Sequence, residues 1–335
     1  MSRIQIQLFG RFCVRYDEQI VAGFEARKLQ ELFGYLLLHR HHPLSREVLA
    51  GLFWPDDTIA QSKKKLRQLL WHLQSALGSL AEAPHDRLLR VEPDQVQMNT
   101  EADFWLDIAV FEKTFAYVEQ IAGPALDSRH VQALHHTVQL YHGSLLEGCY
   151  ENWCLSQREH FQNMYLTMLE KLMSYCEAHR EYDAGILYGM RSINCDRLRE
   201  RAYRRLMRLH YLNGDRAAAL RLYEQCAVAL DEELGVKVSN RTKALYEQIL
   251  ADQQVTPMPT LLLPEARPTL NRSTPSLSEV LDYLTGLQEL LTDLQSQVQQ
   301  SLQQVERALN KNSAPFSSTK IDAGINAPET LRRRY

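Results

Sequence analysis

The chain has 335 residues, with 45% hydrophobic side chains and a formal net charge of −3. This length accommodates two domains and an accessory segment, and the small net charge excludes a globally basic nucleic-acid-binding protein. Residues 1–98 carry 13 Lys/Arg against 11 Asp/Glu, whereas residues 99–160 carry 3 against 9, so any contact with nucleic acid is expected to be local.

The first hundred residues predict strands, then three helices, then a hairpin. Apolar residues that alternate with polar ones predict strands over 4–8, 12–16 and 20–21. Helical spacing predicts helices over about 29–37, 46–53 and 59–77, the last ended by Gly78. A hairpin is expected over 88–91 and 96–98, with its turn at Glu92-Pro93-Asp94-Gln95.

This order of elements is typical of an OmpR/PhoB-type winged helix-turn-helix domain, which we place at residues 1–100. In such domains the third helix enters the major groove of DNA, and the closing hairpin forms the wing. The expected fold class is therefore mainly α, with small β-sheets limited to this N-terminal domain.

The predicted third helix contains the basic run Lys63-Lys64-Lys65-Leu66-Arg67. Its leucines form one apolar stripe, and Lys64, Gln68, Trp71 and Ser75 lie on the opposite face. Cations suit phosphates, and amide or guanidinium groups suit base edges. A solvated charged helix face is the alternative interpretation, and the two hairpin arginines can equally serve solubility. The candidate DNA-binding residues are Lys63, Lys64, Lys65, Arg67, Gln68, Trp71, His72, Ser75, Arg87 and Arg90.

Residues 101–252 are expected to form a second domain, helical from Leu106 to about Leu250. Segments 169–193 and 203–227 align at an offset of 34 residues, with Gly185 matching Ala219. A helix-turn-helix period of this length, with small residues early in the second helix, is typical of tetratricopeptide repeats. Because two repeats alone are marginal, flanking helices are expected to complete the stack.

Three further segments follow. Five prolines predict a semi-extended linker over 253–275, and residues 312–335 are expected to be a disordered tail. Between them, heptad-spaced apolar residues over 276–311 predict a coiled coil that makes a homodimer or other homo-oligomer. A single amphipathic helix packed on the body is the alternative. The expected oligomerisation residues are Leu277, Val280, Leu284, Leu287, Leu291, Leu294, Val298, Leu302, Val305 and Leu309.

Cysteine and histidine patterns argue against an enzyme. None of the six cysteines forms a Cys-x-x-Cys pair, which favours reduced core cysteines. The clusters His39-Arg40-His41-His42 and His135-His136 lack further ligands at zinc-site spacing, and no phosphate loop, nucleophile elbow or HExxH motif occurs. We expect no cofactor and no metal. Without a signal peptide or an apolar run of roughly 20 residues, a cytoplasmic protein outside the membrane is expected.

A set of short motifs extends from residue 3 to about residue 250. They are Leu8-Phe9-Gly10 with Phe12-Cys13-Val14, ARKLQEL at 26–32, LAGLFWPD at 49–56, WLDIAVFE at 105–112, YHGSLLEG at 141–148, ENWC at 151–154 and EELGV at 232–236. Together they resemble the SARP/AfsR-type family of bacterial transcriptional activators. These proteins join an OmpR/PhoB-like winged helix to a tetratricopeptide-like bacterial transcriptional activator domain. The chain departs from the family at Gln74, where members often carry arginine, and it has no Walker motif.

The resemblance implies a sequence-specific, nucleoid-associated transcription regulator. Its partners would be double-stranded promoter DNA and RNA polymerase, which an activator recruits. In such winged helices the loop between the second and third helices can face polymerase, here through Trp54, Asp56 and Asp57. The alternative for this loop is a simple turn in which Asp57 or Thr58 caps the third helix. The rival function is a tetratricopeptide and coiled-coil interaction scaffold with a degenerate winged helix.

Overall fold

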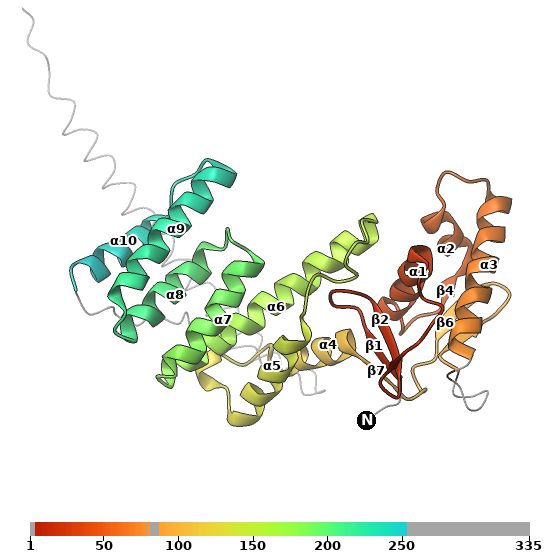
Figure 1. Ribbon diagram of the computed structural model, residues 1–335, viewed down its shortest axis with the longest axis horizontal. Coiled ribbons are helices and arrows are strands. Elements are labelled where there is room, and N and C mark those ends of the chain that lie inside the picture. The colour runs from red at the N-terminus through yellow and green to blue at the C-terminus, as the bar shows by residue number, and fades with distance from the viewer. Residues whose placement is uncertain (1–3, 79, 81–86, 253–335) are drawn as a thin grey trace, which may run out of the picture. The chain divides into compact units, whose positions relative to one another are not determined.

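The computed structural model describes residues 4–78, 80 and 87–252 (Figure 1). Within these residues the protein is mainly helical, and its small sheets belong to the N-terminal part, which confirms the predicted fold class. The linker, coiled coil and tail expected over 253–335 lie outside the described residues, and so do the ten expected oligomerisation residues. No helix of the described part is long and apolar enough to cross a membrane.

A four-stranded sheet contains the start of the chain and a strand that the sequence pattern did not predict. Strands β1 (Ile4–Gln7), β2 (Cys13–Tyr16), β3 (Gln19–Ile20) and β7 (Phe104–Leu106) are arranged in the order β3-β2-β1-β7. The first three are antiparallel neighbours, whereas β7 pairs in parallel with β1 and sets Ile6 opposite Leu106. Ile4 and Ile6 of β1 are buried, as alternation predicts.

The three predicted helices follow strands β1 to β3 in the expected order. They are α1 (Arg27–Leu38), α2 (Arg46–Phe53) and α3 (Ile59–Gly78). Pro55, just beyond α2, restricts the backbone of Trp54 and favours the end of the helix there. The predicted hairpin is β5 (Leu89–Val91) with β6 (Gln95–Met98), and β4 (Leu44–Ser45) adds a third strand beside β6.

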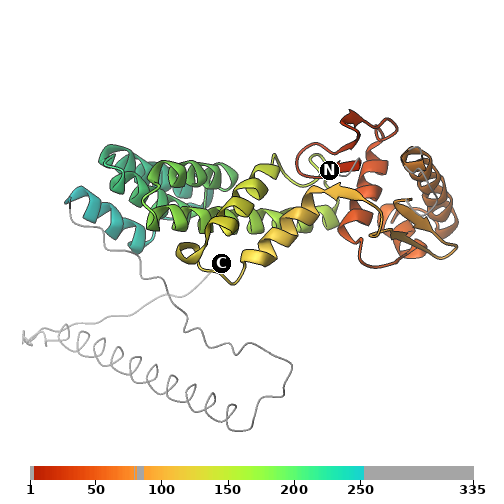
Figure 2. The same ribbon diagram turned by 90° about the horizontal axis from the view of Figure 1, so that it is seen from below.

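The second half of the described chain is a stack of helices (Figure 2). After α4 (Asp107–Val118), a 3₁₀ turn η2 (Gly123–Ala125) and α5 (Ser128–Leu140), the long helix α6 (Asn152–Ala178) begins the predicted repeat. The repeat continues through α7 (Tyr182–Cys195), α8 (Glu200–Leu212) and α9 (Arg216–Leu234), and α10 (Asn240–Leu250) follows. The equivalent turn residues Arg180 and Gly214 both have positive φ, 61° and 84°, so the 34-residue offset is matched in the backbone.

Small residues allow the helices of this stack to approach closely. Gly189 of α7 lies where a Cβ atom would be 2.5 Å from Leu206 of α8 and 2.8 Å from Met173 of α6. Replacing Gly189 with alanine is therefore expected to destabilise the protein by about 1–3 kcal/mol through overpacking. Gly51→Ala in α2 is the matched control, since no neighbouring atom of the described chain lies within 4 Å of the position that its methyl group would take. That change should be neutral or stabilise by up to about 1 kcal/mol. Urea unfolding followed by circular dichroism measures both, and equal effects would contradict the close contact.

Residues 141–151 depart from the expectation of continuous helix between Leu106 and Leu250. This segment, which we name the connector, joins α5 to α6 without helical structure. The departure has a physical reason. Leu146 and Gly148 have positive φ, 46° and 89°, and the connector's backbone groups bond to residues 8–10, just after β1, instead of to a helix of their own. Its sequence periodicity does not reveal this role, because the partners are distant in the chain.

One hydrophobic core runs through both halves, from Ile4 to Leu172. Phe9, just after β1, has its ring centroid 4.8 Å from that of Phe111 in α4 and 5.5 Å from that of Phe161 in α6. Tyr141 of the connector lies on the same cluster, 5.1 Å from Phe9. Because the N-terminal part and the first repeat helices share this core, they pack as one unit.

Candidate nucleic-acid interface and domain junction

Helix α3 separates its residues into a buried stripe and an exposed face. Leu66, Leu70, Leu73 and Leu77 are buried against the domain. The opposite face consists of exposed residues, namely Lys64, Arg67, Gln68, Trp71, His72 and Ser75. The leucine stripe fixes the rotation of the helix about its axis. Its outer side chains therefore form one continuous face.

The cations of this helix differ in their surroundings. The Lys63 ammonium lies 3.0 Å from a carboxylate oxygen of Glu47 in α2, and the Lys65 ammonium lies 2.6 Å from Asp57. Within the described residues, no ion pair is formed by Lys64 or Arg67. Lys63 and Lys65 must exchange an internal partner before they can bind an outside anion, whereas Lys64 and Arg67 can bind one directly.

Trp71 is the most conspicuous side chain of the outer face, because 62% of its surface is exposed. Its ring contacts that of His72 edge-on, with 5.0 Å between the ring centroids. An aromatic ring of this size buries a large apolar area when it meets a partner. The pair therefore gives the cationic face an apolar element that can contact a thymine methyl group or a sugar.

The hairpin of β5 and β6 is anchored to α2 and is acidic at its turn. The Arg46 amide donates to the Asp94 carbonyl at 2.9 Å, and its guanidinium donates to the Glu92 carbonyl at 3.1 Å. The guanidinium of Arg90 lies 3.1 Å from the Asn99 side-chain oxygen and 3.3 Å from a Glu101 carboxylate oxygen. Both hairpin arginines have exposed side chains, but Arg90 already has partners in Asn99 and Glu101.

The loop between α2 and α3 caps the third helix. The Thr58 amide and hydroxyl lie 3.3 and 3.0 Å from the Gln61 side-chain oxygen, and the Ser62 amide donates to the Thr58 carbonyl at 2.9 Å. This is half of a capping box. Asp57 is occupied by Lys65, and Trp54 is half-buried against Phe53. Of the three residues predicted to contact polymerase, only Asp56 is exposed.

Asp107, at the start of α4, joins the two halves of the protein. Its side chain is only 2% exposed. One carboxylate oxygen accepts hydrogen bonds from the Leu8 and Phe9 amides at 2.7 and 2.9 Å, and the other accepts from the Ile108 amide at 2.7 Å. The carboxylate thereby satisfies amides at the end of β1 and at the N-terminus of α4, which would otherwise be buried without partners.

Burial makes the stability of this junction depend on pH. It raises the pKa of Asp107 from 3.8 to about 6, although the backbone hydrogen bonds oppose the shift. Because the folded state holds the proton more tightly, the group's stabilisation is complete below about pH 3.8 and is lost as the pH rises to about 6. Asp107→Asn cannot titrate, so the wild type should lose about 2–3 kcal/mol relative to it between about pH 3 and pH 7. Urea unfolding of both proteins measures the difference, and a gap of opposite sign would contradict this prediction.

The connector fastens the helical stack to residues 8–10, the segment that directly follows β1. The Gly10 amide donates to the Ser144 carbonyl at 2.9 Å, and the Leu146 and Glu147 amides donate to the carbonyls of Leu8 and Gly10 at 2.7 and 3.0 Å. The Arg158 guanidinium of α6 holds the connector from the other side. It donates at 3.0–3.1 Å to three carbonyls of that segment, those of Leu145, Leu146 and Cys149.

Charged residues of α1 complete the junction. Glu31 is buried and lies 2.9 Å from the Arg27 guanidinium and 3.1 Å from the Lys28 ammonium. Lys28 also pairs with Glu151 at 2.7 Å, and Arg27 donates to the Gly148 carbonyl. Two of the short motifs, ARKLQEL and YHGSLLEG, therefore meet at this surface.

Sequence reasoning did not assign these junction residues a role. Glu31 and Asp107 lie inside motifs that indicated a family, but a motif does not reveal its partner. Arg158 lies in none of the motifs. For Asp107 the sequence offers one signal, a carboxylate at the start of a predicted helix. Such carboxylates are too common to identify a junction residue. Within the described residues, no group of three or more His, Cys, Asp or Glu side chains could hold a metal ion.

Comparison with known proteins places the helical half in a family. Residues 106–250 match the bacterial transcriptional activator domain. The fold is similar to that of Mycobacterium tuberculosis EmbR, solved in complex with a low-affinity phosphopeptide, at a TM-score of 0.56 and 18% sequence identity. That alignment covers 76% of this chain and 67% of the EmbR chain. No curated protein sequence matches this chain.

Proposed function

We propose that this chain, whose residues 106–250 match the bacterial transcriptional activator domain, is a SARP-type regulator that binds DNA sequence-specifically and activates transcription by recruiting RNA polymerase. In this proposal residues 1–100 bind promoter DNA, and residues 101–252 are the activator domain. The protein acts in the cytoplasm on the nucleoid. The coiled coil predicted over 276–311 makes it a homodimer or other homo-oligomer.

The observation that carries the proposal is the outer face of α3. A leucine stripe anchors the helix, and the opposite side presents exposed cations, an amide and an aromatic ring in one row. We assign base reading to Lys64, Gln68, Trp71 and Ser75, and phosphate contacts to Lys63, Lys65 and Arg67. The internal partners of Lys63 and Lys65 weaken their share, so Arg67 is the main phosphate ligand of the helix.

In this proposal the β5–β6 hairpin contributes less to DNA binding than α3 does. Its turn carries Glu92 and Asp94, whose charges repel phosphate, and Arg90 already has partners within the protein. Arg87 is the hairpin residue that remains for a backbone or minor-groove contact. For polymerase, exposed Asp56 is the acidic residue of the α2–α3 loop that can meet a basic partner surface.

The test is selection of bound duplexes from a random-sequence pool by the full-length protein, followed by affinity measurements at several salt concentrations. A regulator should enrich a defined sequence and bind it about 10³-fold or more tightly than random duplex. The logarithm of the association constant should fall linearly with the logarithm of salt concentration. If no sequence is enriched, the alternative of an interaction scaffold with a degenerate winged helix replaces the proposal.

A further inference from the structure

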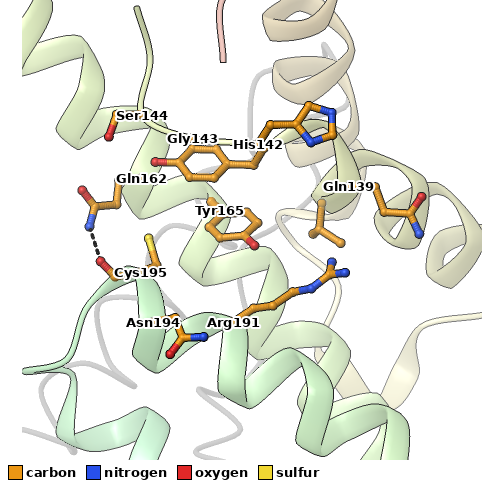
Figure 3. Close-up of a pocket in the computed structure, with 11 residues that line it drawn as sticks. Gln139, His142, Gly143, Ser144, Gln162, Tyr165, Arg191, Asn194 and Cys195 are labelled. Carbon is orange, nitrogen blue, oxygen red and sulfur yellow. Dashed lines mark hydrogen bonds between the residues drawn. The ribbon is translucent and has the colours of Figure 1, made fainter. Parts of the chain in front are cut away.

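A pocket of about 680 Å³ lies in the helical half (Figure 3), and none of its described lining residues belongs to α3. Its walls come from the end of α5, the beginning of the connector, the middle of α6 and the end of α7. This volume is within the range of sites that hold small organic ligands. Neither the family resemblance nor the proposed DNA interface assigns a role to it.

The polar groups of the pocket favour an anion. Arg191 of α7 and His142 of the connector line it, and no acidic residue is among the described residues of its walls. In Figure 3 the Arg191 side chain extends from α7 in the direction of Gln139. No carboxylate in the described part of the chain forms an ion pair with Arg191. A guanidinium without an internal partner can bind a carboxylate or phosphate group through two parallel hydrogen bonds.

Neutral donors line the same pocket. Tyr141 and Tyr165 stack with 4.2 Å between their ring centroids, and both line the pocket. Burial raises the pKa of both phenols, so they stay protonated and can donate hydrogen bonds. Asn194 of α7 adds an amide that both donates and accepts. Gln162 is less available, because its amide donates to the Cys195 carbonyl at 3.2 Å.

The pocket shares a wall with the domain junction. Gly143 and Ser144 of the connector line it. On their other side, the Ser144 carbonyl accepts the Gly10 amide at 2.9 Å, and a Cβ atom on Gly143 would lie 3.1 Å from the Gly10 Cα atom. A ligand that contacts these two residues therefore touches the segment that holds the N-terminal sheet.

We propose that this pocket binds a small organic oxyanion through Arg191, and that the bound ligand changes DNA affinity by acting on the connector. The second part rests on the proposed DNA-binding function, whereas the first does not. Phosphorylated and carboxylated metabolites share the required chemistry. A ligand alters the equilibrium between two states of the junction only as far as it binds one of them more tightly.

The first experiment needs no DNA. Thermal unfolding of the full-length protein is followed with adenosine monophosphate or citrate as the probe. One of them should raise the melting temperature by roughly 3 °C at about ten times its dissociation constant, and the more effective probe identifies the phosphate or the carboxylate source. Arg191→Gln should abolish the shift, and Tyr141→Phe, which keeps the ring, should reduce it. Arg221→Ala, an exposed arginine of α9 outside the pocket, is the matched control and should leave it intact.

Two results would overturn the binding site. One is the absence of a shift with both probes, and the other is an equal shift in wild type and Arg191→Gln. The second experiment measures affinity for the selected duplex with and without the active probe. A change in the wild type that is absent in Arg191→Gln supports coupling through the connector, and an unchanged affinity overturns the coupling while the binding result stands. Failure to bind any duplex sequence would count against the proposed function. It would leave the ligand-binding result of the first experiment unchanged.

Discussion

Replacing Lys64 and Arg67 together with alanine is expected to lower affinity for the selected duplex about 10- to 100-fold, with no loss of folding. Both side chains are exposed on the outer face of α3, opposite its buried leucines. Each cation removed costs a contact to a phosphate or a base edge, worth on the order of 1 kcal/mol. The slope of log affinity against log salt should fall in magnitude by about one to two. Fluorescence anisotropy at several salt concentrations measures both quantities.

Lys63→Ala with Lys65→Ala is the matched control for this experiment. It removes the same charge from the same helix, but each of these lysines already pairs with a carboxylate, Glu47 or Asp57. The loss should therefore be only about threefold, since exposed ion pairs must be exchanged before phosphate is bound. Equal losses in the two double variants would mean that the helix contributes only its overall charge. Unchanged affinity in the first variant would remove α3 as the recognition helix.

Replacing Arg158 with alanine is expected to lower the free energy of unfolding by about 2–4 kcal/mol. The guanidinium is half-buried and donates to three carbonyls of the connector. Leu145, Leu146 and Cys149 are themselves buried, so water does not easily replace the lost donors. The Leu146 carbonyl keeps the Cys149 amide as a donor, so the cost falls mainly on the Leu145 and Cys149 carbonyls. Urea unfolding gives the free energy, and limited proteolysis should show faster cleavage within residues 141–151.

Two comparisons separate this role from a general effect of charge. Arg158→Lys keeps the charge but replaces the planar fork with one ammonium group, and it should recover only part of the stability. Arg221→Ala removes an exposed arginine elsewhere in the stack and should stay within about 0.5 kcal/mol of the wild type. If Arg158→Ala behaves like Arg221→Ala, the connector is held by its backbone bonds to the sheet alone.

Much of the fold follows from local periodicity. Alternation over β1 and β2, the leucine spacing of α3 and the 34-residue offset between α6–α7 and α8–α9 all depend on residues close in the sequence. The structure has these elements where the patterns predict them. The residues on the outer face of α3 could also be predicted from the sequence, because helical periodicity shows which positions lie opposite the leucine stripe.

The missed features all depend on contacts between distant residues. Strand β7 has only three residues and exists because β1 pairs with it. The connector contains apolar residues that suggest helix, yet its backbone bonds to residues 8–10. The ion pairs of Lys63 and Lys65 depend on how α2 and its loop pack on α3. The periodicity of one helix does not reveal which residues of other elements will contact it.

The parallel pairing of β1 with β7 determines the order in which the chain can fold during synthesis. The amides of Leu8 and Phe9 meet Asp107 across separations of 99 and 98 residues, and the Leu8 carbonyl accepts its hydrogen bond from the Leu146 amide. Strand β1 and residues 8–10 after it therefore cannot complete their hydrogen bonds until β7 and the helical half have begun to emerge. Nascent chains arrested before residue 107 should expose residues 4–10 to protease, and chains arrested well beyond Arg158 should protect them. The proposed DNA-binding domain would then become competent only once the activator domain has started to fold.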